Sequence, residues 1–178
     1  MLDIERELKL LAEYKIDCVV IGGVAARAHG SSHETNDLDV CYARDSENLN
    51  KLAAALASVH ATLRGAPGGI PFRLDGETLR RGLNFTFDTD IGPLDLLGEV
   101  LGVGFYQQCA EDSIRIEIFA ETFSILSLDK LIVAKRIAGR PKDLAMLPEL
   151  EAILEYEKVN KTYSENDDED VEDGDEQS

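Results

Sequence analysis

Apolar residues recur along most of the chain at the spacings expected of short helices and strands. Apolar positions three or four residues apart, together with capping residues, predict helices over residues 3–14, 47–59, 127–139 and 141–157. Segments that are β-rich or that alternate between apolar and polar residues predict strands over 16–23, 37–43, 84–88, 94–100, 113–120 and 122–126. This order predicts an α/β (α+β) fold, in which helices flank a mixed β-sheet and two helices close the domain.

The hydrophobic pattern ends near residue 157. Residues 165–178 contain nine acidic residues and no basic one, too little apolar surface to offset the entropy lost on ordering. We therefore predict one domain over residues 1–157 and a disordered acidic C-terminal tail over 158–178. Three roles are open for the tail: it solubilises the protein, mimics a nucleic acid, or occupies a basic cluster as a brake.

The formal net charge of −17 lies partly in this tail, because the rest of the chain has 26 acidic and 18 basic residues. The net negative charge of residues 1–164 argues against a main function in binding long nucleic acids, but it is compatible with a small basic pocket. No apolar run approaches the roughly 20 residues that span a bilayer, and the charged N-terminus does not resemble a signal peptide. With three cysteines that lack paired spacing, we expect a cytoplasmic protein with free thiols and no membrane contact.

Two glycines, Gly22 and Gly23, stand between a predicted strand and a short helix that ends at Gly30. Glycine at such a junction lets the backbone approach a ligand closely and present N–H groups to a phosphate. A tight structural turn would produce the same pattern, so the glycines alone do not decide between the two interpretations.

Three aspartates suggest a metal site. On a strand over 37–43, Asp37 and Asp39 share one face, and two carboxylates side by side need solvent, a proton or a cation. Asp95 lies among apolar residues, where an acid is costly unless it is paired or bound to metal. If the two strands are neighbours, the three carboxylates converge in the way that two Mg²⁺ ions require. Asp88 and Asp90, at a predicted hairpin turn, are the rival candidates.

Lys135 interrupts the apolar stripe of the helix predicted from residue 127. Its ammonium group either points toward a nucleotide phosphate or extends to the surface along the helix. A local basic cluster follows it in the sequence: Arg136, Arg140 and Lys142. His29 and His60 show no spacing typical of metal ligands, and we interpret both as structural.

Three blocks of sequence resemble a known superfamily. The run from Gly22 to Asp39, GG-(x)6-G-x-x-H-x-T-x-D-L-D, resembles the signature of nucleotidyltransferases with the DNA polymerase β-like fold. The most similar branch is the minimal nucleotidyltransferases that include the AbiEii-type abortive-infection toxins. GPLDLLGEV resembles that branch's strand with the third carboxylate, and SLDKLIVAKRIAGRPKDL resembles its lysine-bearing helix and GRPKD turn. The resemblance covers most of residues 15–155.

This resemblance implies an enzyme that moves an NMP from an NTP to an acceptor hydroxyl, with Mg²⁺ or Mn²⁺ as the cofactor. The acceptor would be a tRNA end, a protein or a small molecule, and the enzyme would be a toxin with an antitoxin partner. Asp37, Asp39 and Asp95 would be the catalytic metal ligands, with Asp95 also helping to activate the hydroxyl. The nucleotide would be bound by Gly22, Gly23, Ser31, His33, Lys135 and Arg140.

One position departs from the branch's pattern, since His33 stands where much of the branch has Arg. A neutral imidazole lacks the permanent charge and the two-pronged donor geometry of a guanidinium group. The alternative hypothesis is therefore a catalytically weak or inactive protein that binds a nucleotide and regulates a partner.

Overall fold

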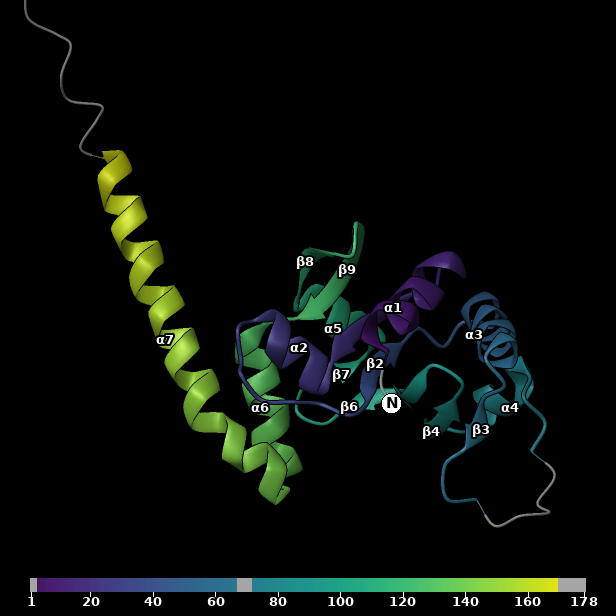
Figure 1. The fold of residues 1–178 in the computed structure, drawn as a ribbon. Helices are drawn as coiled ribbons and strands as arrows, with labels where there is room; N and C mark the ends of the chain where they lie inside the picture. The colour runs from purple at the N-terminus through teal and green to yellow at the C-terminus, as the bar shows by residue number, and fades with distance from the viewer. Residues whose placement is uncertain (1–2, 67–71, 170–178) are drawn as a thin grey trace, which may run out of the picture.

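The structure is a computed structural model, and it describes residues 3–66 and 72–169. A seven-stranded sheet in the order β3-β4-β5-β2-β1-β9-β8 forms its centre (Figure 1). Two neighbouring pairs are parallel, β2 with β5 and β1 with β9, and the other pairs are antiparallel. The strands are β1 (Cys18–Ile21), β2 (Leu38–Tyr42), β3 (Thr62–Leu63), β4 (Asn84–Thr89), β5 (Gly92–Leu97), β8 (Ser113–Ile118) and β9 (Glu121–Leu126).

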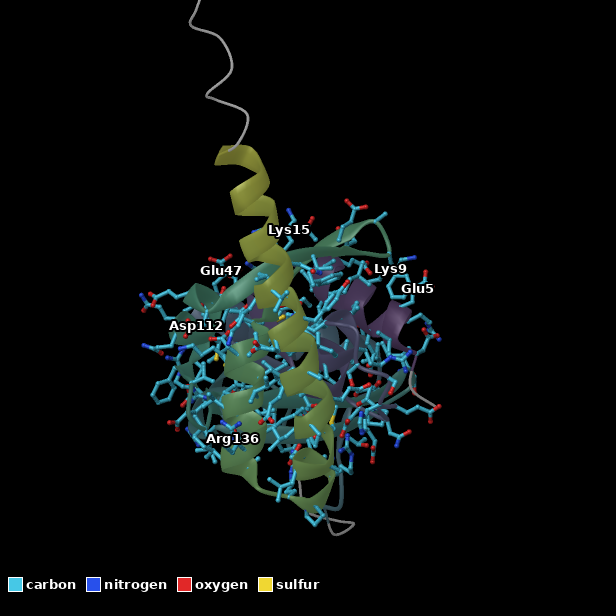
Figure 2. All side chains as sticks on the ribbon, turned by 90° about the vertical axis from the view of Figure 1, so that its left-hand side faces the viewer. Glu5, Lys9, Lys15, Glu47, Asp112 and Arg136 are labelled. Carbon is cyan, nitrogen blue, oxygen red and sulfur yellow. The ribbon has the colours of Figure 1, made fainter. Side chains whose placement is uncertain are left out.

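Helices cover the sheet, and a short two-stranded ribbon of β6 (Glu99–Val100) and β7 (Gly104–Phe105) accompanies it. The helices are α1 (Ile4–Glu13), α2 (Gly22–Ala28), α3 (Ser46–Ser58), α4 (Gly76–Arg81), α5 (Tyr106–Glu111), α6 (Leu128–Ala138) and α7 (Pro141–Glu169). Helix α6 packs between α2 and α7, and α7 projects beyond the body of the molecule (Figures 1 and 2). The Arg136 Nη2 atom donates to Glu151 Oε1 at 2.6 Å and ties α6 to α7 at the surface. The predicted mixed α/β fold is confirmed.

The alternation of side chains along the central strands separates the core from the candidate site. In β5, Leu94 and Leu96 are buried in the core, and Asp95 between them points to the opposite face. In β2, Leu38 and Val40 are buried, and Asp39 lies between them. The apolar face of each strand therefore fixes the direction of its aspartate.

The structure contains β3, β7 and α5, which the sequence pattern did not predict, and it ends two predicted elements at other residues. The strand predicted over 94–100 is divided, because Gly98 turns its N–H to Leu83 O and Asn84 Oδ1 and ends β5 at Leu97. Helix α7 continues to Glu169, past the predicted end at residue 157. Residues 158–169 contain no glycine or proline, the two residues that most disfavour a helix. The domain division at 157 stays a prediction, and residues 170–178 lie outside the described residues.

None of the helices in the described part of the chain combines the length and the apolar composition needed to cross a membrane.

Candidate metal and nucleotide site

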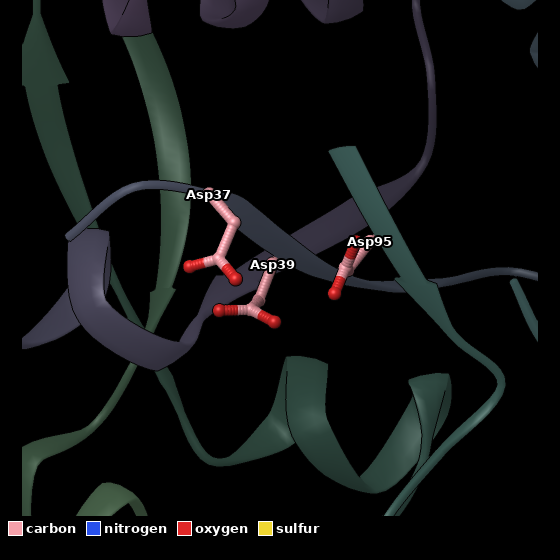
Figure 3. A group of neighbouring side chains, drawn as sticks. All are labelled: Asp37, Asp39 and Asp95. Atoms are coloured by element: carbon pink, nitrogen blue, oxygen red, sulfur yellow. The ribbon is translucent and has the colours of Figure 1, made fainter. Parts of the chain in front are cut away.

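Three carboxylates meet where β2 and β5 run side by side. Asp39 and Asp95 are direct partners in the parallel register of these strands, and Asp37 precedes β2 on the same face. One oxygen from each of Asp37, Asp39 and Asp95 lies within 4.8 Å of the others, and the three side chains point into one space (Figure 3). The structure thus brings together the three aspartates that the sequence predicts as metal ligands.

The surroundings of Asp39 disfavour its ionisation. Burial raises the pKa of Asp39 to about 7, and repulsion from Asp37 and Asp95 adds to that effect, while Lys142 and Lys135 oppose it. Near neutral pH Asp39 is therefore partly protonated unless a cation compensates its charge.

Asp95 carries an oxygen with no hydrogen bond. Burial raises its pKa, against the opposing charge of Arg64. Arg64 Nη2 lies 2.9 Å from Asp95 Oδ1, but that contact lacks hydrogen-bond alignment, and Nη2 donates to the Phe87 carbonyl at 2.8 Å. The buried Oδ1 atom therefore has no hydrogen-bond donor among the described residues.

These observations fit a hard divalent cation. The ligand atoms are all carboxylate oxygens, which Mg²⁺ and Mn²⁺ prefer, and two of the three groups are buried enough to resist ionisation alone. A bound cation would take the place of a proton in compensating the charge of these carboxylates. Asp37, Asp39 and Asp95 are the residues that would hold it.

The glycine pair lets the backbone lie directly against this site. A Cβ atom on Gly22 would fall 2.1 Å from Asp39 Oδ2, and the φ angle of Gly22 is +65°. A Cβ atom on Gly23 would fall 2.4 Å from Oγ1 of Thr35, which also contacts Asp37 Oδ1 at 3.1 Å. Only glycine allows the start of α2 to approach the carboxylates so closely.

A polar cavity of about 220 Å³ lies beside Asp37 and Asp39. Gly22, Gly23 and His33 contribute to its wall, and three cationic side chains line it: Lys135, Arg140 and Lys142. The same wall also contains four carboxylates, those of Glu34, Asp37, Asp39 and Asp143, so cations and carboxylates lie side by side around this cavity.

Lys135 is held inside the protein instead of extending to the surface. Its side chain is 8% exposed, and Nζ lies 3.4 Å from Asp143 Oδ1. Arg140 donates to the same carboxylate through Nε at 2.5 Å and Nη2 at 3.3 Å. Burial acts to raise the pKa of Asp143, but Arg140 and Lys135 outweigh it and keep that pKa below its usual value. Asp143 was missed in the sequence, although the GRPKD segment places it close to Arg140.

Ser31 and His33 are engaged elsewhere. Glu149 on α7 accepts hydrogen bonds from Ser31 Oγ at 2.6 Å and from Ser32 N at 2.9 Å, and its Oε2 lies 2.7 Å from His33 Nδ1. These donors lower the pKa of Glu149 to about 2. His33 still borders the polar cavity, whereas Ser31 does not line it. No signal in the sequence identifies Glu149, because its partners lie more than one hundred positions away.

The rival aspartates lie outside the cluster. Asp88 Oδ1 accepts from Arg64 Nε at 3.0 Å, and the exposed Asp90 lies 2.6 Å from Nδ1 of His60. His29 Nε2 lies 2.8 Å from the Leu126 carbonyl, a structural contact. Neither rival belongs to the group formed by Asp37, Asp39 and Asp95 in the described chain.

Comparison with known proteins adds evidence on the fold. No protein-family model matches the chain, and no curated protein sequence matches it. Among solved structures, the antibiotic-resistance factor ANT(2'')-Ia is similar with a TM-score of 0.52 and 12% identity, over 93% of this chain and 95% of that one. A Thermotoga maritima protein provisionally assigned as a nucleotidyltransferase has a TM-score of 0.45 and 14% identity, over 93% of this chain and 96% of that one.

The chain has a nucleotidyltransferase-like fold. The likeness to ANT(2'')-Ia is evidence on the fold alone, and it favours no branch of the superfamily predicted from the sequence, the AbiEii-type branch included. At these identities the likeness is one of fold, and the activity has to be argued from the site.

Proposed function

We propose that this protein is a metal-dependent nucleotidyltransferase that moves an NMP from an NTP to an acceptor hydroxyl and releases pyrophosphate. The observation that carries the proposal is the group of Asp37, Asp39 and Asp95, which gathers three carboxylate oxygens within 4.8 Å beside a cavity lined by cations. The carboxylates would bind a divalent metal, and the cationic side chains would bind the phosphates of the NTP.

A bound divalent cation would supply charge neutralisation for the reacting phosphate. Lys135, Arg140 and Lys142 would orient the triphosphate in the polar cavity, with the backbone of Gly22 and Gly23 in close approach. Phosphoryl transfer depends mainly on such positioning and on electrostatics.

The acceptor hydroxyl attacks the α-phosphorus in line with the bond to the β-phosphate oxygen, which breaks as pyrophosphate leaves. Asp95, which has a carboxylate oxygen within 4.8 Å of oxygens of Asp37 and Asp39, would receive the hydroxyl proton.

A second candidate function is a nucleotide-binding regulatory protein with weak or no activity. It is favoured by His33, which replaces an Arg of the resembling branch and which is bound to Glu149. The roles as a toxin with an antitoxin partner, and the choice of tRNA or protein as acceptor, stay predictions from the sequence resemblance.

Isothermal titration with each NTP, with and without Mg²⁺, tests the proposal. The wild type is compared with an Asp37→Ala/Asp39→Ala variant and with Asp90→Ala, an exposed aspartate outside the site, as the matched control. We expect Mg²⁺-dependent binding that the double variant loses and the control keeps. Binding without pyrophosphate release over a panel of acceptors would favour the regulatory function, and absence of binding to every NTP would refute both.

A further inference from the structure

A second and larger cavity adjoins the polar one. Its volume is about 430 Å³, within the range of small-molecule sites. The two cavities share Gly22, Asp39, Lys135, Arg140 and Asp143 as a common wall. A molecule in the larger cavity therefore lies against the same Asp39 side chain that contributes to the carboxylate group.

The larger cavity is mainly aliphatic. Nine of its sixteen lining residues carry aliphatic side chains: Ile21, Leu83, Leu97, Val100, Leu101, Leu126, Leu131, Ala134 and Ala138. None of its described lining residues is aromatic, so it lacks the flat side chains on which proteins commonly stack nucleobases. This chemistry suits an aliphatic body better than a nucleobase or an RNA end.

The charged side chains of this cavity indicate which ligand charge it favours. Lys135 and Arg140 are both paired with Asp143 at the shared wall. Glu99, in contrast, lines the cavity with a half-buried carboxylate that has no ion pair or hydrogen bond from another described side chain. Glu99 therefore offers a counter-charge to a cationic group of a ligand in this cavity.

We propose that the larger cavity binds the acceptor, and that the acceptor is an amphipathic amino alcohol. Its aliphatic body contacts the leucines of the cavity, its cationic group meets Glu99, and its hydroxyl reaches the shared wall at Asp39. There the hydroxyl oxygen bonds to the α-phosphorus of the NTP, the bond to the β-phosphate oxygen breaks, pyrophosphate leaves and the proton passes to Asp95. This assignment rests on the proposed nucleotide transfer and names its substrate class.

Binding of simple amino alcohols tests the assignment without any need for turnover. The full chain, with labelled Leu and Ala methyl groups, is titrated without NTP by a series from ethanolamine to 6-amino-1-hexanol and observed by NMR. We expect shifts at Leu97, Leu131 and Ala134, and an affinity that rises about fourfold for each added methylene, the equivalent of about 0.8 kcal/mol. A series with no dependence on chain length, or shifts outside the cavity, would overturn the proposal.

Two variants and a control locate the binding. Ala134→Phe fills the cavity from α6 and should abolish the shifts, whereas Ala54→Phe, at an exposed position of α3 that lines neither cavity, should leave them unchanged. Glu99→Gln should remove the preference for 6-amino-1-hexanol over 1-hexanol. Equal binding by Ala134→Phe would contradict the assignment.

The outcomes also separate this assignment from the nucleotide site. If Mg²⁺-dependent NTP binding is found but no amino alcohol enters the cavity, the acceptor class is wrong and the proposed transfer stands. If a short oligonucleotide with a free 3′ end shifts the same methyl groups at lower concentrations, a nucleic-acid acceptor replaces the amino alcohol. If amino alcohols bind but no NTP does, the acceptor role falls together with the transferase function.

Discussion

Glu7 is a buried carboxyl group, and its replacement should make the stability of the protein less dependent on pH. It lies on the inner side of α1, its residue is 1% exposed, and neither carboxylate oxygen has a hydrogen-bond partner among the described residues. Burial raises the pKa of Glu7 to about 8, and the charges of Asp3, Asp37 and Asp95 add to that effect. The side chain is therefore protonated in the folded protein at neutral pH.

The sign and size of the consequence follow from proton linkage. Below the unfolded pKa of about 4.5, both states bind the proton and Glu7 has no pH-dependent effect. Between pH 4.5 and 8 only the folded state keeps it, so the free energy of unfolding falls by about 1.4 kcal/mol per pH unit. At pH 7 the accumulated destabilisation is about 3 kcal/mol. Glu7→Gln, neutral at every pH, avoids it.

Urea unfolding followed by circular dichroism, at pH 4.5 and at pH 7, measures the effect. Glu7→Gln should match the wild type within about 1 kcal/mol at pH 4.5 and exceed its stability by about 3 kcal/mol at pH 7. That gain corresponds to a rise in Tm of about 6–12 °C for a chain of this size. Glu13→Gln, at an exposed position of the same helix, should change stability by less than about 0.5 kcal/mol at both pH values. An effect of Glu7→Gln that is the same at both pH values would show that Glu7 does not bind its proton more tightly in the folded state.

Three further substitutions probe the site. Gly22→Ala should weaken Mg²⁺-dependent NTP binding at least about tenfold by calorimetry, because its methyl group overlaps the adjoining carboxylate, whereas Gly30→Ala, also at positive φ but with open space, should leave binding unchanged. Asp143→Asn removes the ion-pair partner of the buried Lys135 and should lower the free energy of unfolding in urea by about 3 kcal/mol. A change below about 0.5 kcal/mol would contradict this expectation. The low pKa of Glu149 stabilises the fold above pH 4.5, and that contribution is lost as the pH falls toward 2, so Glu149→Gln should flatten the acid-unfolding profile in this range.

Local sequence patterns were sufficient for the elements that carry the aspartates. The alternation of buried and polar residues in 37–43 and 94–97 reveals which side of each strand an aspartate occupies, because strand geometry repeats every two residues. The parallel pairing of these strands, and hence the register of Asp39 with Asp95, is a tertiary property. The sequence predicted that the carboxylates converge only if the two strands are neighbours, and the structure shows that they are.

The unpredicted parts of the site depend on contacts between distant segments. Glu149 reaches the loop of residues 31–33 only because α7 packs beside α6, and no periodicity encodes that meeting. Arg64 follows the short strand β3, which no apolar pattern marks, yet it lies 2.9 Å from Asp95. Glu7 was predicted on a helix, but its lack of a partner depends on what α1 covers. Sequence patterns reveal which face a residue occupies, and packing decides what meets that face.

The central claim is that Asp37, Asp39 and Asp95 together hold a divalent cation for nucleotide transfer. Mn²⁺ titration followed by electron paramagnetic resonance, in the presence of an NTP, measures this directly for the wild type, Asp39→Asn and Asp90→Asn. Removal of residues that merely support metal ligands weakens binding about 10- to 100-fold, so loss of a ligand should cost at least about tenfold. We predict that loss in Asp39→Asn and wild-type affinity in Asp90→Asn. Equal Mn²⁺ affinity in all three proteins would show that Asp39 is not a ligand of the cation.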